Sequence, residues 1–297
     1  MTKLELTHKK FIEVLKSENK SDSTVVAYNK DIEQIVTFLA KQGIENVEDM
    51  DIKHLEAFMN SLATQNYTPK SISRKTNAAR TFIKYLTKEG YLIEDISSQL
   101  KHPKLETKAP RILSKLEYRA LRDGARDDNR SYAMIEVLLQ TGATISELAG
   151  IKLENLDLKV ETGSVFIPKK NNREERTVPL NKSVVEAINK YVKDSRPKVN
   201  LPAQSVKSTN LFITKTGRPL LIRNIRSTID RYFRIAGVEN AKVNDLRHTF
   251  VAHHLENGVN MLYLSKVAGH KRVSTTERYL QYIKKPEKME KTELGIL

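Results

Sequence analysis

Apolar residues recur at intervals of three or four in the first third of the chain, which is the spacing of a helix with one buried face. Capping candidates at 21–24 precede one such stripe, and Asp51 precedes another. A third begins at Thr68-Pro69, where a side-chain oxygen is followed by a proline suited to the first helical position. The stripes consist of Val25, Tyr28, Ile32, Ile35 and Leu39, then Leu55, Phe58, Met59 and Leu62, then Ile72, Ala79, Ile83 and Leu86. We therefore expect residues 1–100 to form a compact helical domain.

The segment 101–112 interrupts this pattern. It carries Pro103, Pro110 and several charges but few apolar residues, a composition typical of a linker. Ser114 then provides a helix cap for a second domain, which we expect to span residues 113–297.

Helical spacing also dominates the second domain, but three short runs have the character of strands. These runs lie at 155–158, 164–167 and 176–178, and the polar turn 168–175 separates the last two. The predicted helices cover 132–139, 184–191, 224–236, 245–256, 261–267 and 274–282. The predicted fold class is therefore mainly α with a small antiparallel β-sheet in the C-terminal domain.

Charge narrows the functional class. Lys+Arg 51 against Asp+Glu 36 gives a formal net charge of +15 and a pI of about 9.7. Such an excess attracts polyanions, of which nucleic acid is the commonest in a cell, although a merely soluble basic protein would show the same balance. Four basic residues on the predicted helix that begins at Pro69 are candidates for contact with phosphate groups. The alternative is that they form a solvated helix face. They are Arg74, Lys75, Arg80 and Lys84.

Several other classes find no support in the sequence. The absence of cysteine excludes disulfides, thiolate metal sites and cysteine nucleophiles. No run approaches the ~20 apolar residues of a membrane span, and neither a lipidation signal nor a secretion signal is visible. No glycine loop for cradling phosphates is present. We expect no metal, no cofactor and no membrane partner, and a cytoplasmic, nucleoid-associated location.

The C-terminal third contains residue types suited to cleaving a phosphodiester without metal. That reaction needs a nucleophile, cations on the non-bridging oxygens and an acid for the departing 5′ oxygen. Tyr279 is a candidate nucleophile, Arg247 offers a planar fork for phosphate, and His270 lies nine residues before the tyrosine.

Four segments carry a resemblance to a known family. In chain order they read TGATISELAG, REERTVPLN, NDLRHTFVAHHLENG and AGHKRVSTTERYLQY. Together they resemble the tyrosine recombinase (phage integrase) family, and the length and helical N-terminal part resemble its Xer branch. The resemblance extends from Ser21 to Tyr282. It implies a core-binding domain and a catalytic domain that form a C-shaped clamp on a double-stranded DNA recombination site, with four protomers exchanging strands.

The resemblance also implies roles for single residues. Tyr279 matches the nucleophile that forms a 3′-phosphotyrosyl link, and Arg247 matches the second catalytic arginine. His270 matches a position that hydrogen-bonds a phosphate oxygen. The competing interpretations are a buried helix tyrosine, a surface salt-bridge arginine and a helix-terminating histidine.

The hairpin lysine that serves the family as general acid is harder to align. Lys170 takes that position, with Lys169 as the alternative, because the turn is about one residue longer than usual. An ordinary solvated lysine is a serious competitor. Lys169 and Arg173 are further candidates for DNA contact in this turn.

Two positions depart from the family pattern. Thr144 replaces the first arginine and Asn244 replaces a histidine, so one charge and one proton-transfer group are missing. Losing a preorganised donor to an oxyanion costs on the order of 10²–10³ in rate, and losing an acid or base typically costs about 10²–10⁴. His248 is expected to point elsewhere on its helix and is not counted as a replacement.

Two functional hypotheses follow. One is an enzyme that cuts and rejoins DNA with impaired chemistry, and the other is a non-catalytic DNA-binding or synapsis protein derived from such an enzyme. A general nucleic-acid binder is a distant third. The tail after Tyr282 is expected to mediate self-association or pairing with a second recombinase, and a frayed terminus is the alternative. Its apolar anchors are Leu294, Ile296 and Leu297.

Overall fold

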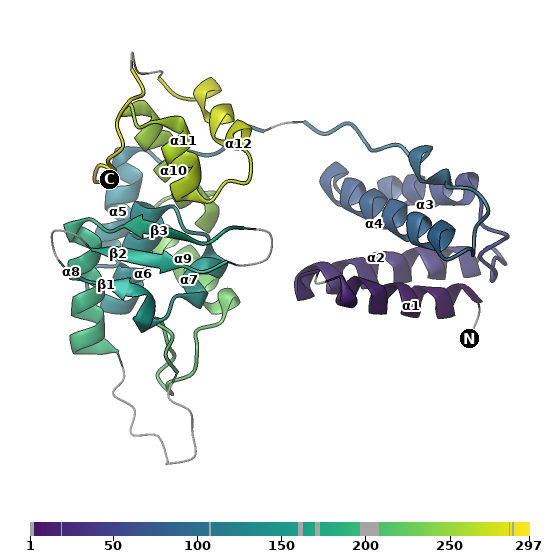
Figure 1. The fold of residues 1–297 in the computed structure, drawn as a ribbon, viewed down its shortest axis with the longest axis horizontal. Helices are drawn as coiled ribbons and strands as arrows, with labels where there is room; N and C mark the ends of the chain where they lie inside the picture. Colours follow the sequence, from purple (N-terminus) through teal and green to yellow (C-terminus); the bar gives the residue numbers. More distant parts are fainter. Residues whose placement is uncertain are drawn as a thin grey trace. The chain divides into compact units, whose positions relative to one another are not determined.

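The computed structural model describes residues 3–18, 20–106, 108–159, 163–169, 173–196, 208–284, 286 and 288–297. The chain divides into two compact units, Met1–Lys108 and Ala109–Leu297, each with its own hydrophobic core. The division falls inside the predicted linker. Helices dominate both units, and among the described residues strands occur only in the second unit, which confirms the predicted fold class (Figure 1).

In its described residues, the N-terminal unit consists of four helices and a short 3₁₀ turn. The predicted caps are present, because the side chains of Ser21, Asp51 and Thr68 accept hydrogen bonds from the backbone at the starts of their helices. The first helix packs on the second and fourth. The sequence does not predict this helix, because its apolar residues are sparse. The elements are α1 (Lys3–Ser17), α2 (Asp22–Ala40), α3 (Ile52–Thr64), α4 (Pro69–Lys88) and η1 (Ile96–Ser98).

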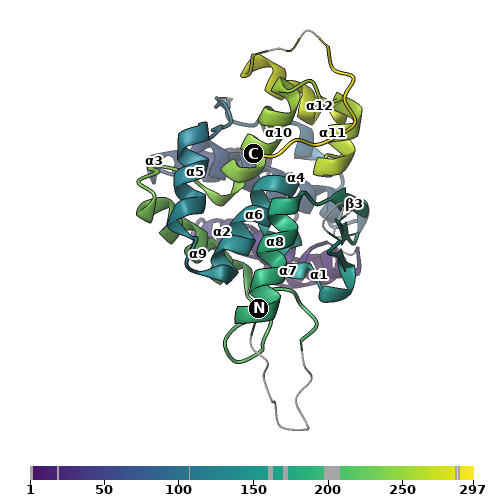
Figure 2. The same ribbon diagram turned by 90° about the vertical axis from the view of Figure 1, so that its left-hand side faces the viewer.

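The C-terminal unit is built around α6 (Asn129–Thr141), whose residues from Ala133 to Thr141 are all buried. Helices α5, α7, α8, α9 and α10 all contact α6 (Figure 2). The helical elements around it are α5 (Lys115–Gly124), α7 (Ile145–Gly150), η2 (Leu153–Asn155), α8 (Lys182–Lys190), the π-helical turn η3 (Tyr191–Ser195), α9 (Ile222–Ile235), α10 (Val243–Glu256), α11 (Met261–Ala268), α12 (Val273–Glu277) and η4 (Arg278–Gln281).

Three short antiparallel strands form the predicted sheet, in the order β1-β2-β3. They are β1 (Leu156–Asp157), β2 (Ser164–Ile167) and β3 (Arg176–Pro179). Val165 pairs with Val178, and both side chains are buried, as alternation along a half-buried strand requires. Strand β3 also contacts α11, which brings the hairpin to the C-terminal helices.

The predicted helix at 274–282 is shorter in the structure. Helix α12 ends at Glu277, and the chain tightens into the 3₁₀ turn η4. The turn packs on α10, and this contact buries the side chain of Tyr279. The tertiary contact therefore decides the conformation of these residues, since 3₁₀ turns are common where a helix end must fit its surroundings.

We predict that Gly142→Ala destabilises the protein by about 2–5 kcal/mol. Gly142 ends α6 with φ at +63°, and a Cβ there would lie 2.4 Å from the Phe250 ring. The left-handed backbone costs roughly 1–2 kcal/mol for an L-residue, and the overlap with a packed ring adds about 1–3 kcal/mol. Chemical denaturation of the variant and the parent protein measures the effect.

The matched control is Gly237→Ala. Gly237 has φ at +67°, but a Cβ added there would have no other atom within 4 Å, so only the backbone cost of roughly 1–2 kcal/mol applies. Equal losses in the two variants would show that Phe250 does not close on Gly142.

Candidate active site

Arg247 is held at the buried centre of the site by the end of α6. Its side chain lies on α10, is 5% exposed and donates from Nη1 to the carbonyl oxygen of Gly142 at 2.6 Å. Burial and the neighbouring charge of Arg173 lower the pKa of Arg247 to about 10, so the guanidinium stays charged at neutral pH. The contact fixes one cation beside the loop that leads into α7.

A buried carboxylate, Glu147, organises two more arginines. Arg176 donates from Nη1 and Nη2 to the two carboxylate oxygens at 2.9 and 3.1 Å, and Arg173 approaches one of them at 3.5 Å. Burial raises the pKa of Glu147, but the hydrogen bonds and charge of Arg176 outweigh it and lower that pKa to about 2. The carboxylate is therefore ionised at physiological pH and links α7 to the hairpin.

Arg176 in turn determines where His270 lies. Its Nε donates to the carbonyl oxygen of Val267 at 2.7 Å, at the end of α11. A Cβ on Gly269 would lie 2.7 Å from Nη1 of Arg176, so only glycine allows this approach. The chain then turns directly into His270.

The His270 ring is half-buried and neutral. Its Nδ1 lies 2.7 Å from the hydroxyl of Thr276, and its plane is nearly parallel to the Tyr279 ring at a centroid distance of 6.5 Å. Burial, followed by the charges of Arg247 and Arg173, lowers the pKa of His270 to about 3. The ring therefore serves as a neutral hydrogen-bonding group.

Tyr279 lies beside these groups, with a side chain that is only 6% exposed. Burial raises the pKa of the phenol, and the positive charge of Arg247 opposes that rise. The hydroxyl is therefore protonated at neutral pH. The structure brings together the three residues that the sequence indicated as nucleophile, cation and hydrogen-bonding histidine.

The expectation that His248 points away from the site is wrong. Its Nδ1 lies 2.6 Å from the Tyr279 hydroxyl, and its Nε2 lies 2.8 Å from Nδ2 of Asn244. The tight turn η4 brings the tyrosine to the face of α10 that carries both residues. The spacing of four between Asn244 and His248 was the available signal, because such pairs are neighbours on a helix.

Thr144 has a structural role at its position. It is the N-cap of α7, where its hydroxyl accepts from Glu147 N at 3.4 Å and its own N–H donates to Glu147 Oε2 at 2.7 Å. It lies two residues after Gly142, whose carbonyl holds Arg247. This position is therefore at the site, but it contributes no charge.

A cavity of about 600 Å³ lies next to the buried arginines. Basic groups predominate among the side chains around it, although two glutamates are also present. Its lining consists of Arg173, Glu174, Glu175, Arg176, Lys266, Gly269, His270 and Lys271. The side chain of Arg173 is 38% exposed, so this guanidinium is accessible to an anion while it touches Glu147.

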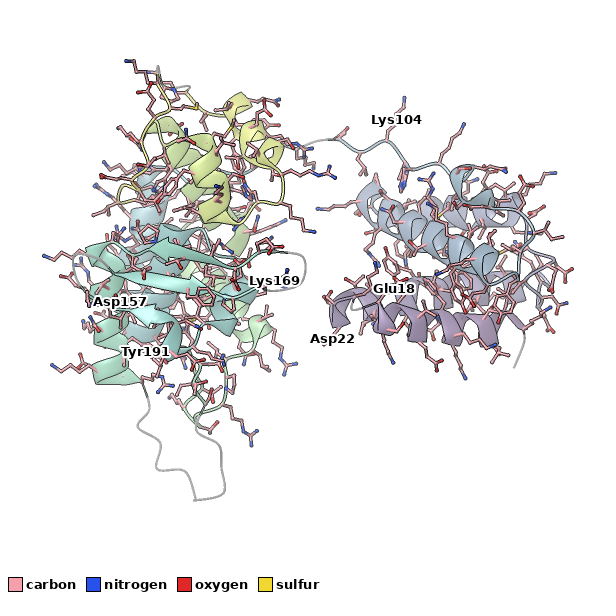
Figure 3. All side chains as sticks on the ribbon, in the orientation of Figure 1. Glu18, Asp22, Lys104, Asp157, Lys169 and Tyr191 are labelled. Atoms are coloured by element: carbon pink, nitrogen blue, oxygen red, sulfur yellow. The ribbon has the colours of Figure 1, made fainter. Side chains whose placement is uncertain are left out.

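The hairpin lysines remain predictions. Lys170 lies outside the described residues. Lys169, labelled near the hairpin in Figure 3, has an exposed ammonium 3.4 Å from Glu174.

The basic residues of α4 differ in what they contact. Lys75 is 3% exposed and donates to Asp31 at 2.8 Å and to Gln34 at 2.5 Å, so its predicted phosphate contact is contradicted by burial in an ion pair. Arg74 is exposed and shares Asp31 with it. Arg80 donates to the carbonyls of Ser97 and Ser98. Lys84 is exposed to solvent.

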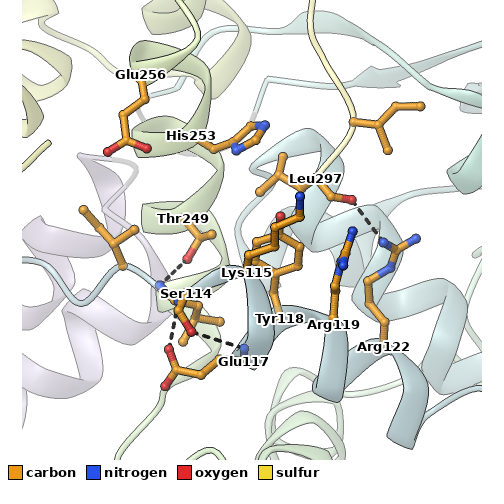
Figure 4. A pocket seen from close by; sticks show the side chains of 13 residues that line it. Ser114, Lys115, Glu117, Tyr118, Arg119, Arg122, Thr249, His253, Glu256 and Leu297 are labelled. Carbon is orange, nitrogen blue, oxygen red and sulfur yellow. Dashed lines mark hydrogen bonds between the residues drawn. The ribbon is translucent and has the colours of Figure 1, made fainter. Parts of the chain in front are cut away.

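The end of the tail lies on its own unit. Leu297 is buried, its N–H donates to Gln140 at 3.1 Å, and its carbonyl oxygen accepts from Gln140 and Arg122 at 3.0 Å each. Figure 4 shows Leu297 between Arg122 and the helix of Thr249, next to the cavity that it lines. Ile296 remains 59% exposed.

Within the part of the chain that the structure describes, no group of three or more His, Asp or Glu side chains is arranged to hold a metal ion. Among the described helices, none is long and apolar enough to cross a membrane.

We predict that Glu147→Gln lowers the free energy of unfolding at pH 7 by about 3–5 kcal/mol, because it leaves Arg176 buried without a charged partner. The stability from Glu147 is present above its unfolded pKa, near 4.5, and is lost as pH falls toward its folded pKa of about 2. Denaturation at pH 7, 4 and 2.5 measures both effects.

The control is Glu154→Gln, which removes an exposed carboxylate paired with Lys152. It should change stability by less than about 1 kcal/mol. The difference between parent and Glu147→Gln should shrink between pH 4.5 and 2. A difference that is constant across this range would contradict the assignment.

Comparisons with known proteins identify the family of the chain. The phage integrase family matches residues 105–285, and the phage integrase N-terminal SAM-like domain matches residues 9–90. A tyrosine recombinase XerC from Natranaerobius thermophilus is 34% identical over 276 residues, which cover 91% of each chain. One from Halalkalibacterium halodurans is 30% identical over 281 residues, covering 92% of each.

Solved structures show the same fold. A XerA recombinase is 26% identical, with 93% of each chain covered and a TM-score of 0.52. A lambda integrase tetramer bound to a Holliday junction has a TM-score of 0.74 at 15% identity, covering 94% of this chain and 77% of that one. The integrase family matches more than half of the chain, and relatives of at least 30% identity match almost all of it. The chain therefore belongs to the phage integrase family of tyrosine recombinases, with Xer-type recombinases among its relatives.

Proposed function

We propose that this protein is a site-specific DNA recombinase that binds duplex DNA and exchanges strands through a 3′-phosphotyrosyl intermediate. The observation that carries the proposal is that Tyr279, Arg247 and His270 lie together beside a cavity lined mainly by basic side chains. Integrases bound to DNA sites and to a Holliday junction are among the structures that share the fold. The formal charge of +15 supports the same class of partner.

The proposed reaction assigns one step to each group. Oη of Tyr279 loses its proton to water and attacks phosphorus, the bond from phosphorus to the 5′ oxygen breaks, and that oxygen takes a proton from the general acid. Arg247 and neutral His270 donate hydrogen bonds to non-bridging oxygens. The hairpin lysine, Lys170 or Lys169, is the proposed acid.

Arg173 is the proposed second cation, in place of the arginine that the family has at position 144. It contacts the same carboxylate as Arg176, it lines the cavity, and its charge contributes to the lowered pKa of both Arg247 and His270. A guanidinium that reaches from a turn is less fixed than one on a helix. We therefore propose cleavage that is weakened by about 10²–10³ relative to a complete site.

A second candidate function is a non-catalytic binder that retains DNA recognition and synapsis. The uncharged Thr144 and the non-titrating Asn244 favour it. For either function we propose a clamp of the two units on duplex DNA, a nucleoid-associated location in the cytoplasm, and association on DNA with a second copy or a second recombinase. Ile296 is exposed although the neighbouring Leu297 is buried. This supports a tail that leaves its own unit and packs on a neighbouring protomer when the protein associates on DNA.

Covalent trapping on nicked duplexes tests the proposed function. Sites are first selected by binding from a random duplex library, and each is then nicked near its centre so that cleavage releases a short strand. We expect the unmodified protein to form a slow adduct and Tyr279→Phe to form none. The Thr144→Arg/Asn244→His double variant should form the adduct about 10²-fold faster, because it restores an arginine that can bind the scissile phosphate.

The variants also separate the two candidate functions. Shifted complexes without an adduct from the unmodified chain or the double variant would leave the non-catalytic binder as the function. An adduct that persists in Tyr279→Phe would remove Tyr279 from the role of nucleophile.

The salt dependence of binding tests the basic face of α4. We expect Lys84→Met to reduce the slope of log K against log salt by about one, as the loss of one phosphate contact requires. Lys75→Met should leave the slope unchanged, because its ammonium is buried against Asp31. Thermal unfolding of both variants checks that they fold, and an equal loss of slope in both would contradict the assignment.

A further inference from the structure

Hydrogen bonds connect Asn244 to the phenolic oxygen of Tyr279 through both nitrogens of the His248 ring. Nδ2 of Asn244 lies 2.8 Å from Nε2, and Nδ1 lies 2.6 Å from Tyr279 Oη. The two rings are tilted by 44° with centroids 5.8 Å apart, so they meet edge to edge at this contact and do not stack. The chain of hydrogen bonds ends on the atom that the proposed function makes the nucleophile.

The direction of these hydrogen bonds follows from the chemistry of the amide. An amide nitrogen only donates, so Nε2 of His248 accepts and carries no proton. In a neutral imidazole the proton then resides on Nδ1, which donates to Tyr279 Oη.

Burial keeps the His248 ring neutral. It lowers the pKa of His248; the charge of Asp245 opposes this effect, and the charge of Arg247 adds to it. His270, on the other side of the tyrosine, is itself neutral near physiological pH. A neutral ring has only one N–H, and Asn244 decides which nitrogen carries it.

We propose that His248 donates a hydrogen bond from Nδ1 to Tyr279 Oη, which positions the phenol and stabilises its ionised form, and that Asn244 sets the tautomer that makes this donation possible. The inference rests on the proposed function for the role of Tyr279 as nucleophile. His248 touches the reacting oxygen and is a catalytic residue. Asn244 acts through His248 and is a positioning residue.

The hydrogen bond matters most when the phenol ionises. Burial makes the phenolate costly, and a hydrogen bond to a charged acceptor is stronger than one to a neutral acceptor. Because Nδ1 already holds a proton, His248 does not accept the phenolic one, which passes to water. Oη then bonds to phosphorus as the bond to the 5′ oxygen breaks, and that oxygen takes its proton from the general acid.

Asn244 is then a working part of the site, and not only a lost histidine. Its amide does not titrate near neutral pH, so Nδ2 donates to His248 throughout the physiological range. An aspartate at the same place would instead accept from Nε2–H and leave Nδ1 without its proton. The proposal therefore predicts opposite tautomers for the two side chains.

Nitrogen NMR of the imidazole rings in the DNA-free, full-length protein measures the tautomer directly. We expect the Nδ1–H form of His248 in the unmodified chain and the Nε2–H form in Asn244→Asp. The signal is assigned by its loss in His248→Gln. The matched control is Asn257→Asp, an exposed position at the end of the same helix, which should leave the His248 tautomer unchanged.

Ionisation of the nucleophile provides the second readout. A 3,5-difluorotyrosine at position 279 is titrated by fluorine NMR without DNA. Removing the donor with His248→Phe should raise the apparent pKa by about one unit, a tenfold lower ionisation constant. His248→Gln keeps an N–H donor and should recover part of the change, and His253→Phe, on another face of α10, should cause none.

Each outcome decides the proposal separately from the proposed function, since neither measurement uses DNA. An Nε2–H tautomer in the unmodified chain would overturn it even if the protein cleaves DNA. So would an unchanged ionisation constant in a folded His248→Phe variant. If that variant does not fold, the tautomers of the unmodified chain and of Asn244→Asp still decide.

Discussion

The bidentate ion pair between Glu147 and Arg176 is the interaction on which the rest of the site depends. The carboxylate belongs to α7 and the guanidinium to β3, and the same guanidinium binds the carbonyl of Val267 near the end of α11. Three elements that are distant in sequence are thereby fixed around one buried charge pair. Because a buried charge without its partner is costly, few other arrangements of these elements are accessible. The position of His270, one residue after Gly269, follows from this pair.

The surrounding electrostatics prepare the site for an anion. Burial, together with the mutual repulsion of Arg173, Arg176 and Arg247, lowers the pKa of Arg247 and keeps His270 neutral. Glu147 compensates only part of this charge. A phosphate would relieve the repulsion and would receive hydrogen bonds from groups that are already oriented, which is the basis of electrostatic preorganisation. The tyrosine stays protonated under the same conditions, so ionising the nucleophile becomes a separate requirement.

One helix links the tail to the site. Gln140 of α6 binds the backbone of Leu297, and two residues later the carbonyl of Gly142 holds Arg247. The tail and the cation therefore rest on the same end of a helix that is buried along most of its length. In the N-terminal unit, basic residues that look alike in the sequence differ in burial. Lys75 is buried and neutralises Asp31, whereas Lys84 faces solvent.

The sequence by itself determined the two helical units, the three-stranded sheet, the caps of α2 to α5 and the family, because these depend on local periodicity, capping chemistry and ordered motifs. It also indicated Tyr279, Arg247 and His270. Only the tertiary structure decided that Lys75 is buried, that the chain tightens before Tyr279, and that His248 and Asn244 reach its hydroxyl. The physical reason is that these outcomes depend on which elements pack together. A helix position fixes the direction of a side chain on its own helix, whereas its partner is set by another segment of the chain.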